Sequence, residues 1–242
     1  MSSKIWSSNW RRPSNLPFPQ IWHTFTAPDL DGTSVSYEIR DLPPLRFSEA
    51  CELMIEHYIP DEPLARIMKL KDEPDSVNEY VELWRMAMQQ GIVVGCFKDD
   101  ELVGVNMTGV LSKSDELRDH KYRGKAFHFT IELYLWLLQQ FDMYEKFGID
   151  SFLLGYGMGV QRKYRYRGIA TEFLKGRRPM LEAIGVPYTT TMFTSGGTQK
   201  AATKAGYTTF YEIKYEECIK MGYPLKGIEV ESVKMQGCGI EN

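Results

Sequence analysis

The chain has 242 residues, of which 43% are apolar and 25% charged, and its formal net charge is −3. This composition is ordinary for a soluble globular protein, and the length allows a substantial core. The mild acidity argues against nucleic acid as the main partner, because a nucleic-acid-binding chain carries a basic excess.

The four cysteines lie far apart and show neither a CxxC metal spacing nor the density of a disulfide scaffold. They are Cys51, Cys96, Cys218 and Cys238. No apolar run reaches the roughly 18 residues that a membrane-spanning helix needs. Residues 1–12 also lack the apolar core of a signal peptide. We therefore expect a cytoplasmic, monomeric protein with reduced thiols, no bound metal and no membrane contact.

Residues 1–33 are rich in Ser, Pro and Trp and show no hydrophobic period, which predicts an irregular N-terminal arm. The remainder, 34–242, reads as one domain without repeats or a linker. Seven segments have the alternation or the β-branched and aromatic content of strands. They are 34–41, 92–97, 102–111, 151–160, 187–193, 208–216 and 229–235.

Helical periodicity marks the segments between these strands. They are 47–58, a turn that restarts at 61–64, 77–90, about 127–148, 171–184 and 198–205. Pro179 lies inside the segment 171–184 and predicts a kink there. Helices thus separate the strands of a mostly antiparallel sheet, with one parallel strand–helix–strand unit at 151–193. The predicted fold class is α+β.

The most unusual stretch is the corner where the strand 151–160 turns into the following helix. Between Val160 and Arg178 there are seven Lys or Arg and one acid, Glu172. Gly168 and Ala170 let the backbone approach a ligand, and the first N–H groups of a helix favour an anion. The N–H groups from Tyr166 to Thr171 would then hold a diphosphate. The alternative is that Gly168 only permits close packing and that the arginines form a solvated face.

This corner is neither a GxxxxGK[ST] phosphate loop nor a GxGxxG dinucleotide fingerprint. The preceding strand contains Gly155, Gly157 and Gly159. Glycine inside a strand often marks the close approach of a ligand or of another backbone.

A strand followed by Arg165-x-x-Gly168-x-Ala170 and a helix is similar to the acetyl-CoA motif of the GNAT acetyltransferases. From about residue 34 to 235 the chain further resembles the insect arylalkylamine N-acetyltransferase-like proteins. The stretches that carry this resemblance are Tyr58-Ile59-Pro60-Asp61-Glu62-Pro63-Leu64, Phe141-Asp142-Met143-Tyr144, Tyr164-Arg165 with Gly168-Ile169-Ala170, and Thr194-Ser195-x-x-Thr198 before Lys204-Ala205-Gly206-Tyr207. The resemblance implies the GNAT fold, a mixed, mostly antiparallel sheet of about seven strands with helices on both faces.

The resemblance also implies that acetyl-CoA lies in a cleft between the strands 151–160 and 187–193. The residues expected to bind it are Met158, Val160, Arg165, Tyr166, Arg167, Gly168, Ile169, Ala170 and Thr171. A strand N–H near Met158 or Val160 would stabilise the oxyanion of the reaction. Lys200 and Lys204 are placed either to reach a CoA phosphate or to form a solvated face.

An amine arrives protonated at neutral pH and must lose a proton before it attacks a thioester, and a partly buried carboxylate can accept that proton. The resemblance gives this role to Glu62. The other reading of an acid at this place is a helix N-cap, which suits Asp61 just before Pro63. We therefore expect Asp61 to cap the helix and Glu62 to act as the base.

In the family, two serines four residues apart line the thioester and assist proton transfer, and here the matching residues are Thr194 and Thr198. Both keep a hydroxyl and add a methyl group. Thr198 has an equal alternative role as the N-cap of the helix that follows. Many GNAT enzymes place a tyrosine acid at the position of Ala202, so this helix supplies no such acid.

The resemblance implies direct acetyl transfer from acetyl-CoA to a small primary amine, of the arylalkylamine type represented by dopamine, serotonin and tyramine. Candidates for an aromatic wall are Tyr58, Phe127, Phe129, Tyr134 and Phe193, and His57 and His128 read as structural histidines, with His57 a weaker candidate near Glu62. Two alternatives stay open. One is a CoA-binding module with a degenerate site, supported by Tyr166 where relatives carry glycine. The other is an acyltransferase for other amines or longer acyl-CoA.

Overall fold

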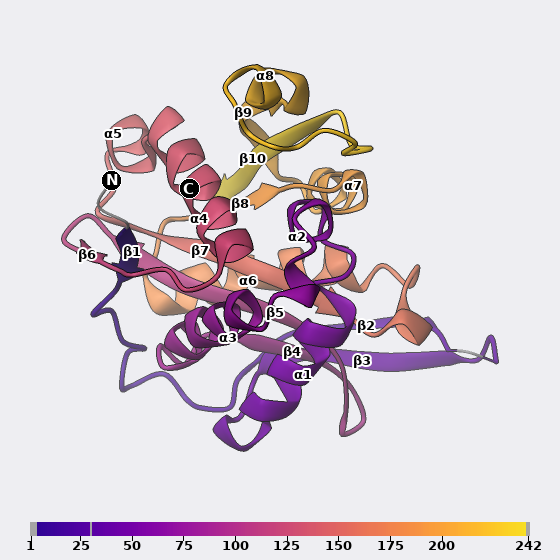
Figure 1. Cartoon of the computed structure of the whole chain (residues 1–242). Coiled ribbons are helices and arrows are strands. Elements are labelled where there is room, and N and C mark those ends of the chain that lie inside the picture. The colour runs from indigo at the N-terminus through magenta and orange to yellow at the C-terminus, as the bar shows by residue number, and fades with distance from the viewer. Residues whose placement is uncertain (1–3, 30, 241–242) are drawn as a thin grey trace.

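The computed structural model describes residues 4–29 and 31–240, and within them eight strands form one sheet in the order β2-β3-β4-β5-β7-β8-β10-β9 (Figure 1). These strands are β2 (Ile21–Pro28), β3 (Ser34–Asp41), β4 (Val94–Lys98), β5 (Glu101–Ser112), β7 (Ser151–Val160), β8 (Tyr188–Phe193), β9 (Thr208–Lys214) and β10 (Ser232–Gly239). Two short strands, β1 (Lys4–Ser7) and β6 (Glu116–Asp119), pair with each other in a separate sheet. Neighbouring strands of the large sheet are antiparallel except β7 and β8, which are parallel. The expected fold class is confirmed.

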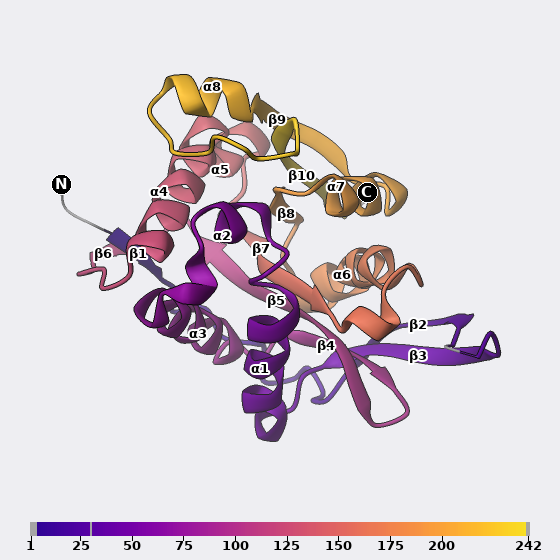
Figure 2. The same cartoon turned by 45° about the vertical axis from the view of Figure 1, so that its right-hand side comes forward.

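Helices cover both faces of the sheet. They are α1 (Phe47–His57), α2 (Pro63–Ile67), α3 (Pro74–Met88), α4 (Lys125–Gln140), α5 (Met143–Phe147), α6 (Ile169–Ile184), α7 (Gly196–Lys204) and α8 (Tyr215–Lys220), with 3-10 turns η1 (Pro44–Arg46), η2 (Leu70–Asp72) and η3 (Arg162–Tyr164). Helices α1 and α3 pack on one face and α6 on the other (Figure 2). Among residues 4–29 and 31–240, no helix has the length and apolar character to cross a membrane.

The central strands β4 and β5 are buried along nearly their whole length because both of their faces are covered. Phe97 and Val105 pack on the side of α1 and α3, whereas Cys96 and Val103 pack on the side of α6. The site therefore stands on a sheet that is fixed by a core on each face.

The N-terminal arm, expected to be irregular over 1–33, contributes the edge strand β2, and this is why the sheet has one more strand than the seven expected. The Asp41 carboxylate, which is fully buried, binds the arm to strand β3. Asp41 accepts hydrogen bonds from Trp22 Nε1 and Gln20 N, both at 2.8 Å, and pairs with Arg12 at 2.9 Å. These contacts add to the ladder that pairs β2 with β3, the next strand along the chain.

Further element boundaries differ from the sequence expectation, and the last strand, expected over 229–235, is β10 (Ser232–Gly239). The helix expected over about 127–148 is interrupted, because the Asp142 side chain accepts from Tyr144 N and Glu145 N and so begins a separate helix, α5. The strand expected over 208–216 ends at Lys214, where α8 begins. Helix α6 continues through Pro179, which is exposed.

Side chains of the protein occupy the space beside each of the three glycines of β7. A β-bulge at Tyr156 reverses the faces of the strand, since Met107 pairs with Gly157 and Thr108 with Gly155. A Cβ on Gly157 would meet Met54 and Tyr58 on the α1 side. A Cβ on Gly155 would instead meet Thr191 Oγ1 and lie 2.6 Å from Arg177 Nη2 on the α6 side.

We expect Gly155→Ala to lower the free energy of unfolding by about 1–3 kcal/mol, because the new methyl group must displace a buried arginine. Urea denaturation followed by circular dichroism measures this change. The matched control is Gly196→Ala in the first turn of α7, where an added Cβ meets nothing within 4 Å. That variant should be neutral or slightly stabilising. Equal behaviour of the two variants would contradict the close packing inferred at Gly155.

Candidate active site

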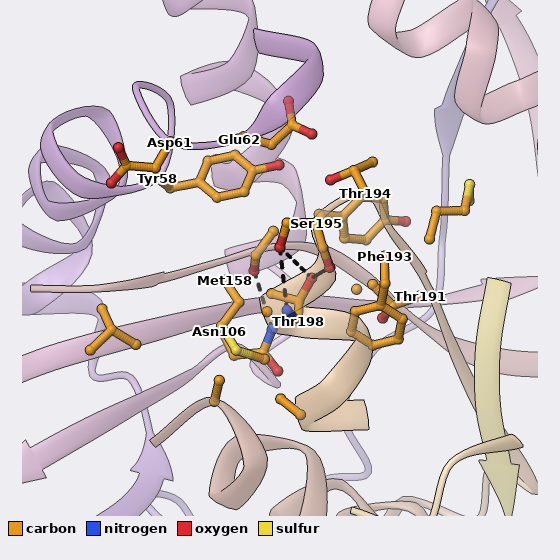
Figure 3. A pocket seen from close by; sticks show the side chains of 18 of the residues that line it. Tyr58, Asp61, Glu62, Asn106, Met158, Thr191, Phe193, Thr194, Ser195 and Thr198 are labelled. Atoms are coloured by element: carbon orange, nitrogen blue, oxygen red, sulfur yellow. Dashed lines mark hydrogen bonds between the residues drawn. The ribbon is translucent and has the colours of Figure 1, made fainter. Parts of the chain in front are cut away.

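One cavity of about 600 Å³ joins the corner after β7 to the turn before α2. Its walls come from segments far apart in the sequence, namely 57–63, 154–160, 164–171 and 191–204. Figure 3 shows Glu62, Thr194 and the hydroxyl end of Tyr58 near one end of this cavity, with Asn106 and Met158 on the other side of the view.

The cavity opens because β7 and β8 diverge. They are paired only at Leu153 with Thr189 and at Leu154 with Thr190. Beyond Leu154 the edge of β7 that faces β8 has no ladder partner in the described chain, although its other edge stays paired with β5 up to Val160. Met158 and Val160 line the cavity on this edge. An extended ligand with amide groups can therefore hydrogen-bond along the free edge of β7.

The corner presents the N-terminus of α6 to the cavity. Gly168 precedes the helix with φ 81°, a left-handed conformation that suits glycine, and no side chain caps the first N–H groups. Ile169, Ala170 and Thr171 follow and line the cavity. The side chains of Lys200 and Lys204 also line it, from α7. The arrangement favours a phosphate group at this end.

Arg165 connects this corner to the segment that carries Glu62. Its Nη1 pairs with Asp61 Oδ2 at 2.6 Å and its Nη2 donates to the His57 carbonyl at 2.7 Å. Its Nε donates to the Val160 carbonyl at 3.1 Å. Although Arg165 lines the cavity, its guanidinium is already used by these three protein groups.

The side chains of Arg167 and Tyr166, two residues whose N–H groups were expected to contact a phosphate, lie in different places. The Arg167 guanidinium donates to the carbonyls of Pro28, Lys163 and Arg165 and does not reach the cavity wall. Tyr166 has φ 65° and a fully exposed side chain at the mouth of the cavity. A tyrosine in this conformation is strained.

Glu62 is the residue that caps α2. Its Oε2 accepts from Ala65 N at 2.5 Å, whereas Asp61 lies outside the cap and pairs with Arg165 and Arg162. The expectation that Asp61 caps this helix is therefore wrong. The reason is that Glu62, not Asp61, directly precedes the first helical residue, Pro63.

The second oxygen of Glu62 is not used by the cap of α2. Glu62 is 5% exposed and lines the cavity, and its Oε1 has no hydrogen-bond partner in the described chain. Burial raises the pKa of Glu62, although the Ala65 N–H and the Thr194 hydroxyl act in the opposite direction. A carboxylate with a raised pKa and a free oxygen is suited to accept a proton near neutral pH.

Four tyrosines surround the Glu62 carboxylate, and sequence reasoning missed two of them, Tyr80 and Tyr215. Burial raises the pKa of each, and the Glu62 charge acts in the same direction on Tyr58, Tyr80, Tyr134 and Tyr215. All four phenols are therefore neutral at pH 7 and able to donate hydrogen bonds. Tyr80 had a usable signal, because it lies on the apolar stripe of α3 with Trp84 and Ala87.

The residues Thr194 and Thr198 have different surroundings. Thr194 is buried beside Glu62, and its carbonyl accepts from the Tyr215 hydroxyl at 3.1 Å. The N-cap of α7 is Ser195, whose side chain accepts from Thr198 N, so the alternative of Thr198 as the cap is wrong. Ser195 directly precedes the helix, and the Thr198 hydroxyl bonds to Ser195 Oγ at 2.8 Å within the first turn. Thr198 lines the cavity from that position.

Of the aromatic residues expected at the site, Tyr58, Tyr134 and Phe193 line the cavity. Phe127 is instead fully buried against Tyr80, and Phe129 packs on Tyr223.

The two histidines noted in the sequence also lie in different places. His57 lines the cavity, and burial lowers its pKa, so it is neutral at pH 7. His128 pairs with Glu132 at 3.0 Å and stacks on Tyr122, away from the cavity lining. Within the described ranges, no group of three or more His, Cys, Asp or Glu side chains could hold a metal ion.

Arg177 also lines the cavity, whereas the sequence analysis counted it among the basic residues of the corner. It is 1% exposed and lies under the point where β7 and β8 separate. Its spacing of four residues from both Phe173 and Leu181, which are buried, puts it on the inward face of α6. That spacing was the available signal.

We expect Arg165→Gln to lower the free energy of unfolding by about 1–3 kcal/mol, because two backbone carbonyls and Asp61 lose a charged donor. The control is Arg162→Gln, since Arg162 also reaches Asp61 but has a 59% exposed side chain. Its effect should stay below about 1 kcal/mol. Urea denaturation gives both values. If Arg165→Gln leaves stability unchanged and only weakens acetyl-CoA binding, Arg165 binds a phosphate of the donor and does not hold the corner against the segment that carries Asp61.

Comparisons with solved structures show which known proteins share this architecture. The protein designated arylalkylamine N-acetyltransferase 7 of the yellow fever mosquito Aedes aegypti is 31% identical, with a TM-score of 0.92 over 96% of this chain and 100% of that one. Arylalkylamine N-acetyltransferase 2 of the same mosquito is 15% identical, with a TM-score of 0.73 over 85% and 99% of the two chains. The polyamine N-acetyltransferase of Drosophila melanogaster, which forms N-acetylagmatine, is 16% identical, with a TM-score of 0.71 over 84% and 100%. The last two show the shared fold alone.

No protein-family model and no curated protein sequence matches the chain. The assignment therefore comes from the mosquito structure at 31% identity, which is aligned along its whole length. The chain belongs to the insect arylalkylamine N-acetyltransferase family of the GNAT acetyltransferases.

Proposed function

We propose that the protein transfers the acetyl group of acetyl-CoA to a small primary amine of the arylalkylamine type, with Glu62 as general base. One observation carries this proposal: a buried carboxylate with a free oxygen faces a cavity that reaches an uncapped helix N-terminus. The family membership and the divergence of β7 from β8 support it.

Acetyl-CoA fits the residues that are present. The N–H groups of Ile169, Ala170 and Thr171 would hold its diphosphate, with Lys200 and Lys204 close by. The free edge of β7 at Met158 and Val160 would bind the pantetheine arm and leave the thioester near the bulge at Tyr156. The expected cofactor-binding residues Arg165 and Arg167 would act through the backbone and by holding the corner in place.

The amine would enter between Tyr58 and Tyr134 and meet Glu62 Oε1, which takes its proton. Thr194, beside the same carboxylate, would orient the amine or a bridging water. The neutral tyrosines would donate hydrogen bonds without competing for the proton, because the pKa of each is raised. Thr198 lies further from Glu62 and would contact the donor.

The charges of the cavity favour an arylalkylamine over a polyamine. Only Asp61 and Glu62 supply carboxylates to the described lining, and Asp61 is already paired with Arg165 and Arg162. A second cation of a polyamine would therefore lie buried without a partner, which is costly. An apolar aromatic body would instead pack against Tyr58, Tyr134 and Phe193.

We expect Glu62→Gln to lower kcat/KM for amines by about 10²–10⁴-fold, because the amide cannot accept the proton. The glutamine oxygen can still accept from Ala65 N, so the cap of α2 and the fold are kept, unlike in Glu62→Ala. Thiol release from acetyl-CoA, assayed over a panel of arylalkylamines and polyamines, measures the change. The control is Glu56→Gln, which removes a carboxylate that is 74% exposed. Stabilisation by CoA without turnover of any amine would instead favour a CoA-binding module.

The pH dependence gives a separate prediction. Because burial raises the pKa of Glu62 above 4.5, kcat should fall as the pH decreases through that raised value, where the carboxyl becomes protonated. The parent protein should therefore lose activity on an acid limb that lies above pH 4.5, and Glu62→Gln should lack this limb. Samples returned to pH 7.5 before assay control for acid unfolding. A limb that persists in the variant would assign the base to another group.

A further inference from the structure

Arg177 is a buried cation, and its hydrogen-bond partners within residues 4–29 and 31–240 are all neutral. Its Nε and Nη2 donate to Asn106 Oδ1 at 3.1 and 3.0 Å. Its Nη1 donates to Thr191 Oγ1 at 2.8 Å and Thr189 Oγ1 at 3.1 Å. The titratable groups that act on it are Tyr207 and Cys238, and neither is a carboxylate.

A buried charge is normally paired with an opposite charge, because the loss of hydration is costly. Burial lowers the pKa of Arg177, but an arginine stays protonated in proteins. Neutral hydrogen bonds hold the guanidinium in a fixed orientation and leave its positive charge uncompensated. Such a site stabilises negative charge that appears nearby.

The guanidinium lies at the closed end of the opening between β7 and β8. It bonds to Thr189 and Thr191 of β8, and it occupies the space that a side chain at Gly155 of β7 would need. Arg177 and Thr191 line the same cavity as Met158 and Glu62. A donor held by its phosphates at α6, with its thioester near the bulge at Tyr156, would bring its reactive end towards this point.

We propose that Arg177 is the fixed positive charge that stabilises the thiolate of CoA as it leaves. This inference rests on the proposed function. In the reaction the amine nitrogen forms a bond to the acetyl carbon, and the C–S bond breaks with its electron pair going to sulfur. Glu62 accepts the first proton of the ammonium group, and the second is lost from the new amide nitrogen to solvent. The sulfur then needs no proton from an acid, because Arg177 stabilises it as an anion.

Arg177 also has a positioning role, which the test must separate from the electrostatic one. Asn106, its acceptor, donates through Nδ2 to the Gly157 carbonyl at 3.2 Å and so supports the bulged part of β7. A purely structural role would change stability and donor affinity. It would leave the acidity of a bound thiol unchanged.

The experiment titrates the thiol of CoA bound to the full chain, by the ultraviolet absorbance of the thiolate, with desulfo-CoA as the blank. In the parent protein the midpoint should lie at least about one pH unit below that of free CoA. Arg177→Met should move it up by about one unit or more, and Arg177→Lys should keep part of the shift. The control Lys175→Met, which removes an exposed charge from the same helix, should leave it unchanged.

The titration of CoA bound to the parent protein can contradict the role of Arg177 without any variant. The proposal therefore stays testable even if Arg177→Met fails to fold. A bound thiol that titrates like free CoA, or an Arg177→Met variant that binds desulfo-CoA normally and titrates like the parent, contradicts the role of Arg177. Failure of the parent to bind CoA or desulfo-CoA in calorimetry would contradict the proposed function itself. The two failures are therefore distinguishable.

Discussion

The three contacts of Arg165 are the interaction on which the site depends. Its guanidinium holds the Val160 carbonyl at the end of β7, the His57 carbonyl at the end of α1 and the Asp61 carboxylate next to Glu62. The corner would bind the donor and Glu62 would deprotonate the acceptor, so one side chain fixes the distance between the two halves of the reaction. A sub-ångström change there would misalign the attack.

The cavity carries two buried charges of opposite sign, and each fits one change in charge during acetyl transfer. In the proposed reaction Glu62 would gain a proton at one end, and Arg177 would stabilise the sulfur that gains an electron pair at the other. Both charges are held by neutral hydrogen-bond partners, Ala65 N for Glu62 and Asn106 with two threonines for Arg177. Fixed charges of this kind need little reorganisation in the transition state. The burial of the Arg177 guanidinium explains why strand β7 has a glycine, Gly155, beside it.

Much of the fold could be predicted from sequence, because most elements follow a clear hydrophobic period and the corner at Arg165–Ala170 has a local motif. Strand β2 was not predicted, because only Trp22 and Ala27 of its residues are buried and it lacks a continuous apolar face, although it pairs with the next strand, β3. The capping of α2 by Glu62 and not by Asp61 accompanies a local turn, in which the N–H groups of both residues bond to the Tyr58 carbonyl, at 3.0 and 2.9 Å. Sequence places both acids before Pro63 and does not specify that turn.

The pairing of Asp61 has a consequence for which amine the cavity can hold. Had Asp61 capped α2, its carboxylate would be free of Arg165, and the cavity could neutralise two cations. Because Asp61 is paired with two arginines, the cavity has one unpaired carboxylate, and Glu62 would lose its negative charge if it took the proton of the amine as proposed. After that step no unpaired anion is left in the described lining for a second ammonium group. In the proposed function, Arg165 would thus both align base and donor and favour acceptors with one amine and an apolar body.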